Sequence, residues 1–244
     1  MTTEANSSGA KTAVPPMPSP VAMIRTLGLI ALFAGLSVVL VFQWTDPIIK
    51  EKERLALEKA VFQVVPGVDP ESGKRVSYAV DADDLRRLDE TESGEADVFA
   101  VYGKTGELAG IAMQGAAQGY QDVVRTLFAY DPGCECIVGL TIMKSTDTPG
   151  MGDKKTVEGN KAFMKNFAAL SVALTPDKSG LAHPVDTVKN GTKTQPWEVD
   201  AISGATITSR AIGNGLRKTT DELVPVIARH LDEIKSIPEK KAVP

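Results

Sequence analysis

Residues 200–206 read Asp200-Ala201-Ile202-Ser203-Gly204-Ala205-Thr206 and lead directly into a stretch with helical periodicity. From Thr208 onward this stretch places Ile212, Leu216 and, more loosely, Leu223 on one side, which predicts a helix. The free N–H groups at the start of such a helix, and the positive end of its dipole, face the preceding residues. A phosphate group is favoured at this position.

Gly204 and Ala205 leave room for such a group. Glycine adopts positive φ without steric cost, and alanine adds almost no bulk. The Thr206 hydroxyl is therefore a candidate to carry a phosphate ester. The alternative is an ordinary turn with a helix cap, because Ser and Thr are preferred capping residues. The short core Ser203–Thr206 alone favours that turn, whereas the complete seven-residue pattern and the companion segments favour the phosphate.

With Ile207, Thr208 and Ser209 after it, the segment resembles the flavinylation motif of the FMN-binding subunits of bacterial membrane electron-transport complexes. In that family the last threonine of the core holds FMN through a phosphoester. The resemblance implies that Thr206 is the covalent attachment residue, and that a separate flavin transferase attaches FMN from FAD. Around the phosphate it implies Ser203, Gly204, Ala205 and Thr208, and it assigns Asp200 to recognition by the transferase.

A second segment, 147–154, resembles the T-P-G-x-G loop of the same family, which approaches the flavin ring. By that resemblance the residues near the ring are Thr148, Pro149, Gly150, Met151 and Gly152. Taken alone, the segment is equally typical of a plain Pro-Gly turn. The chain departs from the family at 144–147, where relatives commonly carry a His and a Glu, and no role is assigned to Asp147. Gly119-Tyr120 matches a Gly-Tyr pair of the family.

The N-terminal region predicts one membrane anchor. No charged residue occurs from Thr26 to Thr45, and about 20 apolar helical residues span a bilayer. Residues 21–45 are therefore predicted to form a transmembrane helix. A cleaved signal peptide is the alternative, but the apolar stretch exceeds the roughly 7 to 15 residues of a signal sequence and no small-x-small site follows it.

The side of the membrane is not given by the charges, because Lys and Arg are more numerous after the span than before it. The family resemblance implies a single-pass protein of the cytoplasmic (inner) membrane. It places the C-terminal domain on the periplasmic, extracytoplasmic side.

The composition of the remaining segments predicts two tails, a stalk helix and one domain. Residues 1–20 are rich in Ser, Thr, Ala and Pro and predict a disordered tail. After Asp46-Pro47 an amphipathic pattern predicts a stalk helix at 46–66. A domain at 67–235 and a tail at 236–244 follow. The acidic residues of 69–95 predict a solvated surface rather than a metal site, because they show no ligand spacing.

The domain contains two predicted β-hairpins, 99–102 with 108–113 and 123–130 with 136–143, and a short helix at 160–170. The fold class is therefore predicted as α+β: a single N-terminal transmembrane helix is followed by one FMN-binding domain with a mostly antiparallel sheet and flanking helices. Cys134 and Cys136 are the only cysteines, and separate thiols are expected because closure of a C-x-C ring is strained.

Several functions are disfavoured. The net charge of −4 and 5% aromatic content give no platform for nucleic acid. No metal site is expected, and no hydrolase elbow, P-loop or dinucleotide-binding glycine motif occurs. No catalytic acid, base or nucleophile is assigned.

The resemblance implies an electron-relay subunit that carries one covalent FMN on Thr206. Its partners would be the other subunits of a membrane-bound, ion-translocating electron-transport complex. It would not be a stand-alone catalyst. It favours the G subunit of an Rnf-type complex. Three alternatives stay open: the C subunit of a sodium-pumping NADH:quinone reductase, a membrane-tethered assembly module without flavin, and a stand-alone extracytoplasmic flavin reductase.

Overall fold

The computed structural model describes residues 19–70, 72–81, 84–88 and 96–236. The chain divides into two compact units, Met1–Lys52 and Glu53–Pro244. Apart from their innermost residues, the tails predicted at 1–20 and 236–244 lie outside the described residues, as do several acidic residues of 69–95.

Helix α1, Pro20–Val64, is 45 residues long, and its N-terminal part is apolar enough to cross a membrane by length and composition. Its large apolar side chains from Val21 to Phe42 are exposed, as required of a helix that faces lipid. The segments predicted separately at 21–45 and 46–66 lie in one continuous helix, since Pro47 is inside α1. A proline removes one backbone donor and can bend a helix without ending it.

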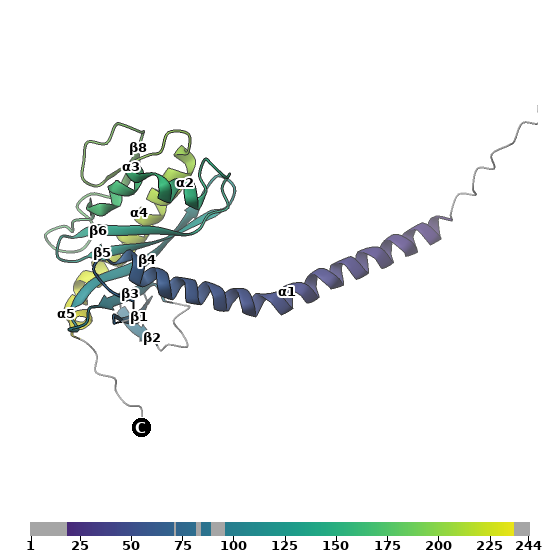
Figure 1. The fold of residues 1–244 in the computed structure, drawn as a ribbon, viewed down its shortest axis with the longest axis horizontal. Coiled ribbons are helices and arrows are strands. Elements are labelled where there is room, and N and C mark those ends of the chain that lie inside the picture. Colours follow the sequence, from purple (N-terminus) through teal and green to yellow (C-terminus); the bar gives the residue numbers. More distant parts are fainter. Residues whose placement is uncertain (1–18, 71, 82–83, 89–95, 237–244) are drawn as a thin grey trace, which may run out of the picture. The chain divides into compact units, whose positions relative to one another are not determined.

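The second unit is built on a seven-stranded antiparallel sheet with the order β2-β1-β3-β4-β5-β6-β7 (Figure 1). Its strands are β1 Lys74–Asp81, β2 Asp84–Leu88, β3 Val98–Tyr102, β4 Leu108–Gln118, β5 Val123–Asp131, β6 Cys136–Lys144 and β7 Leu170–Ser171. The two predicted hairpins are confirmed as β3–β4 and β5–β6. Strands β8, Asp186–Val188, and β9, Glu198–Asp200, form a separate parallel pair.

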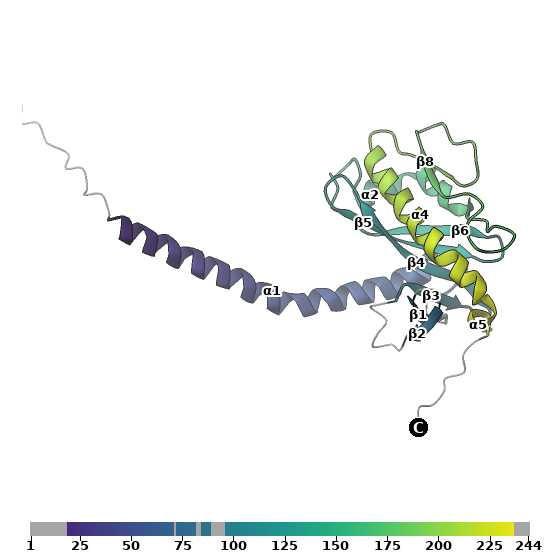
Figure 2. The same ribbon diagram turned by 180° about the vertical axis from the view of Figure 1, so that it is seen from behind.

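Strand alternation gives the sheet two apolar faces. Along β3, Val98, Ala100 and Tyr102 belong to one buried cluster, whereas Phe99 and Val101 belong to the other. Helix α4, Thr206–Arg229, covers the first face, as the view from behind shows (Figure 2). The last turns of α1 join the cluster of the second face. The sheet is therefore sandwiched between helical segments, as expected for strands that are apolar on both faces.

The remaining helices are short: α2 Lys154–Gly159, α3 Lys161–Met164, the 3-10 helix η2 Lys165–Ala168, and α5 Leu231–Lys235. The helix predicted at 160–170 is thus confirmed only in its first part. Phe163 and Phe167 are buried and pack edge to face with ring centroids 5.2 Å apart. Leu170 instead begins β7, where pairing with β6 replaces the helix.

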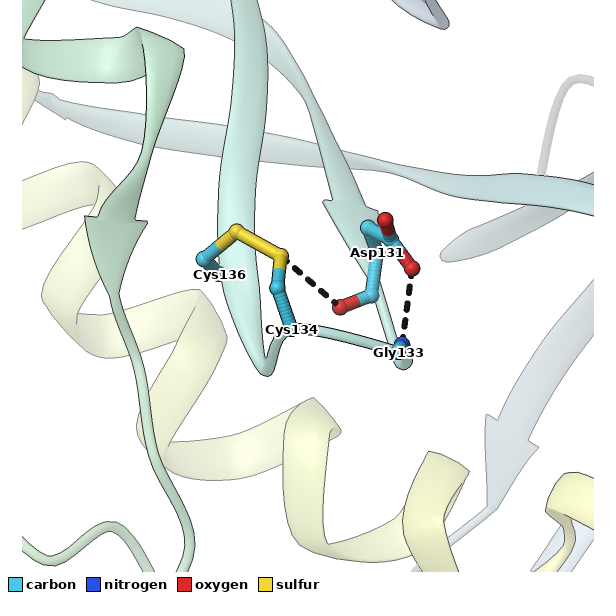
Figure 3. Close-up of a disulfide and its surroundings, with 4 residues drawn as sticks. All are labelled: Asp131, Gly133, Cys134 and Cys136. Atoms are coloured by element: carbon cyan, nitrogen blue, oxygen red, sulfur yellow. Dashed lines mark hydrogen bonds between the residues drawn. A yellow bond between two sulfur atoms is a disulfide. The ribbon is translucent and has the colours of Figure 1, made fainter.

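The turn between β5 and β6 is closed by a disulfide between Cys134 and Cys136 (Figure 3). The expectation of separate thiols was therefore wrong. Glu135 takes φ of 50° and folds the chain back, so that the cysteine Cα atoms are 5.2 Å apart, within the usual range for a disulfide. The N–H of Gly133 donates to Asp131 at 2.7 Å and closes the same turn.

Two glycines let helices approach the sheet closely. At Gly115 on β4, an added Cβ would lie 3.1 Å from the carbonyl carbon of Gly215 on α4. At Gly139 on β6, it would lie 2.2 Å from the carbonyl oxygen of Val64 at the end of α1. Both obstacles are backbone atoms, which cannot move aside as a flexible side chain can.

We expect Gly139→Ala to lower the free energy of unfolding by about 1–3 kcal/mol, because the added methyl group forces the backbone of α1 and β6 apart. The measurement is thermal unfolding of the full chain in detergent, followed by circular dichroism. Gly159→Ala is the matched control, since its added methyl group meets no atom within 4 Å. Equal unfolding midpoints for the two variants would contradict this close packing of α1 against β6.

Candidate functional site

The N-terminal end of α4 is free to bind an external group. Thr206 is the first helical residue, and the Ala205 that precedes it provides no side-chain cap. The N–H of Ser209 already bonds to the Ala205 carbonyl at 2.9 Å, so the N–H groups of residues 206–208 have no acceptor within the helix. Thr206 is half-buried, and the structure gives its hydroxyl no hydrogen bond to any described residue. The predicted free helix end is therefore present.

The loop before the helix has a short exposed tip. Ser203 and Gly204 are exposed, and Gly204 takes φ of 84°, a left-handed conformation that favours glycine. An added Cβ at Gly204 would meet no atom within 4 Å, so the space beside it is open. The positive φ and the open space agree with the prediction that Gly204 leaves room for a phosphate.

A buried carboxylate joins three segments at this end of the domain. Asp147 is 3% exposed and accepts the hydroxyl proton of Thr208 at 2.6 Å. It also accepts the N–H of Gln121 at 3.0 Å and the N–H of Tyr120 at 3.5 Å. The turn between β4 and β5, the loop after β6 and the first turn of α4 are thereby tied to one side chain. The sequence assigned no role to Asp147.

The same hydrogen bonds determine the charge of Asp147. Burial alone would raise the pKa of its carboxyl group, but the N–H of Gln121, the Thr208 hydroxyl and the N–H of Tyr120 stabilise the anion. Together they hold the pKa below its ordinary value of 3.8. The side chain is therefore negatively charged at neutral pH, and the three donors stabilise this charge within the protein.

The loop at 148–152 lies directly against α4. The N–H groups of Met151 and Gly152 bond to the Thr148 carbonyl at 3.1 and 3.2 Å, and Gly150 takes φ of 82°. At Gly152 an added Cβ would lie 2.2 Å from the Thr208 hydroxyl oxygen. The two segments singled out in the sequence are thus in contact.

Three exposed apolar side chains surround this junction. Apart from Leu55 on α1, the large hydrophobic residues exposed in the described part of Glu53–Pro244 are Tyr120, Met151 and Ile207, at 66%, 60% and 51%. Each belongs to one of the segments that Asp147 joins. Exposed apolar groups on segments that are tied together suggest a binding surface, and aromatic, thioether and aliphatic side chains suit a flat apolar ligand.

The residues predicted for the site occupy different positions. Ser203, Gly204, Pro149, Gly150 and Met151 are exposed, Thr206 and Thr148 are half-buried, and Ala205, Thr208 and Gly152 are buried. The Thr208 hydroxyl, expected beside the phosphate, instead donates to Asp147, so that only its backbone N–H belongs to the free helix end.

A model of the FMN-binding domain family matches residues 119–221. The match contains Tyr120, Asp147, the loop at 148–152 and Thr206, and excludes α1 and β1–β4. All three segments at the candidate site therefore lie within the matched region.

Two curated relatives have similar sequences. The G subunit of the ion-translocating oxidoreductase complex of Shewanella loihica is 27% identical over 194 residues, which cover 79% of this chain and 84% of the relative. The G subunit of the Na(+)-translocating ferredoxin:NAD(+) oxidoreductase complex of Acetobacterium woodii is 27% identical over 166 residues, which cover 68% of each chain.

The fold is also that of a solved structure. The crystal structure of Shewanella oneidensis NqrC has a TM-score of 0.55 and 19% identity, and the similarity covers 76% of this chain and 99% of that one. This likeness confirms the predicted fold, in which an antiparallel sheet carries flanking helices.

We expect Asp147→Asn to lower the free energy of unfolding by about 1–3 kcal/mol at pH 7, because the buried donors lose a charged acceptor. Since the folded pKa of Asp147 lies below the unfolded one, its contribution is complete above the unfolded pKa and disappears as the pH falls through the folded pKa. Urea unfolding at several pH values measures this. The difference between wild type and variant should shrink below about pH 4; a constant difference from pH 7 to 3 would contradict it.

Proposed function

We propose that this chain, whose residues 119–221 match a model of the FMN-binding domain family, is an electron-relay subunit that carries FMN on Thr206 through a phosphoester. It would work within a membrane-bound, ion-translocating oxidoreductase complex. The observation that carries the proposal is the position of Thr206 at the free N-terminal end of α4. The relatives support the assignment to such a complex, because both are named as its G subunit.

The site fits a phosphate group. An FMN phosphate esterified to Thr206 would carry one negative charge, and the N–H groups of residues 206–208 and the α4 dipole favour an anion there. Gly204 leaves the adjacent space open. The nearby Asp147 carboxylate keeps its negative charge, but both of its oxygens are directed to donors of the protein, the Thr208 hydroxyl and the N–H groups of Gln121 and Tyr120.

Attachment transfers a phosphoryl group without oxidation or reduction. In this step the Thr206 oxygen would form a bond to the FMN phosphorus of FAD, the phosphoanhydride bond would break, and AMP would leave with the electron pair. The hydroxyl proton passes to a base. Asp147 bonds to Thr208 rather than to Thr206, so it is not placed as that base, which favours a separate flavin transferase.

The apolar surface formed by Tyr120, Met151 and Ile207 is where the flavin ring would lie. FMN supplies reversible electron transfer when bound, and the protein supplies its position and surroundings. Thr148, Pro149, Gly150 and Gly152 hold Met151 in place through the loop turns. Electron transfer by bound FMN would require no acid, base or nucleophile of this chain, as proposed for a relay subunit.

The alternatives differ in what supports them. The C subunit of a sodium-pumping NADH:quinone reductase has the support of a shared fold at 19% identity, whereas the relatives named as G subunits match over most of the sequence. An assembly module without flavin would leave the free helix end and the exposed apolar side chains without a ligand. A stand-alone flavin reductase would need a site for a soluble substrate, and no specific observation on the described residues favours one.

The disulfide supports the proposed side of the membrane. Disulfides persist in oxidising compartments and are rare in the cytosol. The Cys134–Cys136 bond therefore favours a domain on the periplasmic, extracytoplasmic side, with the apolar part of α1 as the membrane anchor. A covalent bond would also keep FMN on the protein at a location without a flavin pool.

We expect full-length protein co-expressed with a flavin transferase to gain the mass of one covalently bound FMN and to fluoresce in a denaturing gel. Thr206→Ala should lose both signals completely, because no ester oxygen is left. Thr105→Ala is the matched control and should keep them, since it removes an exposed threonine hydroxyl in the turn between β3 and β4, outside the candidate site. Unmodified wild type, or modified Thr206→Ala, would refute the attachment.

The side of the membrane on which the C-terminal domain lies can be tested with Cys134 and Cys136, the only two cysteines of the chain. A membrane-impermeant maleimide should label intact spheroplasts only after an impermeant reductant has opened the Cys134–Cys136 bond. Labelling that requires lysis would place the domain in the cytoplasm, and labelling without reductant would show free thiols.

A further inference from the structure

The disulfide between Cys134 and Cys136 closes a very small ring. One residue separates the two cysteines, and the stabilisation expected from a disulfide falls as the loop that it closes becomes shorter. The β5–β6 hairpin is paired along its length without this bond, and the N–H of Gly133 bonds to Asp131 within the same turn. The disulfide is therefore poorly suited to a purely structural role.

The two cysteines differ in exposure. Cys134 is exposed in the turn, whereas Cys136 is the first residue of β6 and is 7% exposed. A thiolate attacks a disulfide at one sulfur and releases the other. An external thiolate can therefore reach Cys134, and Cys136 is then the sulfur that leaves.

The turn provides a hydrogen-bond acceptor for the reduced form of Cys134. Its Sγ lies 3.7 Å from the Asp131 carbonyl oxygen (Figure 3). The sulfur carries no proton in the disulfide, so this contact acts as a hydrogen bond only when Cys134 is a thiol, which is a weak donor. A neighbouring group that stabilises the reduced form makes a disulfide a stronger oxidant.

Glu135, between the two cysteines, connects the disulfide turn with another segment. Its carbonyl accepts the N–H of Val172 at 2.9 Å, and its Oε2 accepts the N–H of Leu174 at 2.9 Å. The φ of 50° at Glu135 is unfavourable for a residue other than glycine, and the closed ring helps to hold it. Opening the disulfide frees this backbone, so both hydrogen bonds to residues 172–174 should weaken.

The disulfide lies far from the candidate flavin site. The turn that contains Tyr120 leads into the start of β5, whereas the disulfide turn follows the end of β5. The nine residues of this strand span about 30 Å. A flavin on Thr206 would therefore not touch the disulfide, and a thiol is the direct source of electrons for it.

We propose that Cys134 and Cys136 form a thiol–disulfide exchange site whose substrate is an accessible dithiol of a second protein. A thiolate of the dithiol attacks Cys134 Sγ, the bond between the two cysteines breaks, and Cys136 leaves with the electron pair and takes up a proton. The second thiolate of the dithiol attacks the mixed disulfide and releases Cys134, which takes up the other proton. The dithiol is thereby oxidised to a disulfide, and the cysteine pair is reduced to two thiols.

The experiment mixes the unmodified full chain in detergent with an equimolar amount of reduced thioredoxin at pH 7, without oxygen. Thiols are counted after acid quenching and alkylation. About half or more of the Cys134–Cys136 bonds should be reduced at equilibrium, with thioredoxin oxidised to the same extent, whereas structural disulfides mostly stay closed against this reductant. The same ratio should be reached from reduced chain and oxidised thioredoxin. The double variant Cys134→Ser with Cys136→Ser is the control and should leave thioredoxin reduced.

Two further readouts test the order of the steps and their effect on the fold. With a thioredoxin that keeps only its attacking cysteine, peptide mass spectrometry should find the mixed disulfide on Cys134 and a free thiol at Cys136. Amide hydrogen exchange at Val172 and Leu174 should become about tenfold faster on reduction and in the double variant, and should stay unchanged at Phe128 in the middle of β5.

A bond that stays mostly closed when equilibrium is approached from both directions would overturn the exchange site, as would a mixed disulfide found on Cys136. Unchanged hydrogen exchange at Val172 and Leu174 would overturn the release of Glu135. None of these measurements depends on flavin, so their failure is distinct from failure of the proposed attachment to Thr206.

Discussion

The hydrogen bond from Thr208 to Asp147, 2.6 Å long and spanning 61 residues of sequence, is the contact on which the candidate site depends. It connects the first turn of α4 with the loop after β6, and the same carboxylate holds the turn between β4 and β5. A buried charge is costly unless it is well supplied with donors. Three donors meet this requirement, and in doing so they fix three loop segments that would otherwise move separately.

The strands at the centre of the sheet were predictable because both of their faces are apolar and their turns contain Gly and Pro. The β3–β4 and β5–β6 hairpins follow from that pattern. The strands β1 and β2 lie at one end of the sheet and carry polar, partly exposed residues. Their sequences therefore lack the apolar alternation by which a strand is predicted. The pairing of β1 with β3, and of β2 with β1, depends on tertiary contacts. The continuation of α1 through Pro47 could not be predicted from the proline alone. A proline removes one backbone donor, and a long helix can continue past it.

The site was predictable in its local features and not in its connections. The positive φ of Gly204 and the free N–H groups of α4 follow from residue types and spacing. Asp147 gave no signal, because two of its partners are backbone groups in another turn and the third is a threonine 61 residues away. The Cys134–Cys136 bond was mispredicted since the left-handed backbone at Glu135 is unusual for that residue type.

The close approach of Gly115 and Gly215 determines the rotation of α4 about its own axis. Gly215 lies against β4. The direction in which each residue from Thr206 to Gly215 points is therefore fixed by how many positions separate it from Gly215. One inserted or deleted residue in this interval would turn Thr206 by about 100° around the helix. Substitutions on the outer face, for example at Asn214, leave that angle unchanged. The number of residues in this interval is therefore more tightly constrained than their identity.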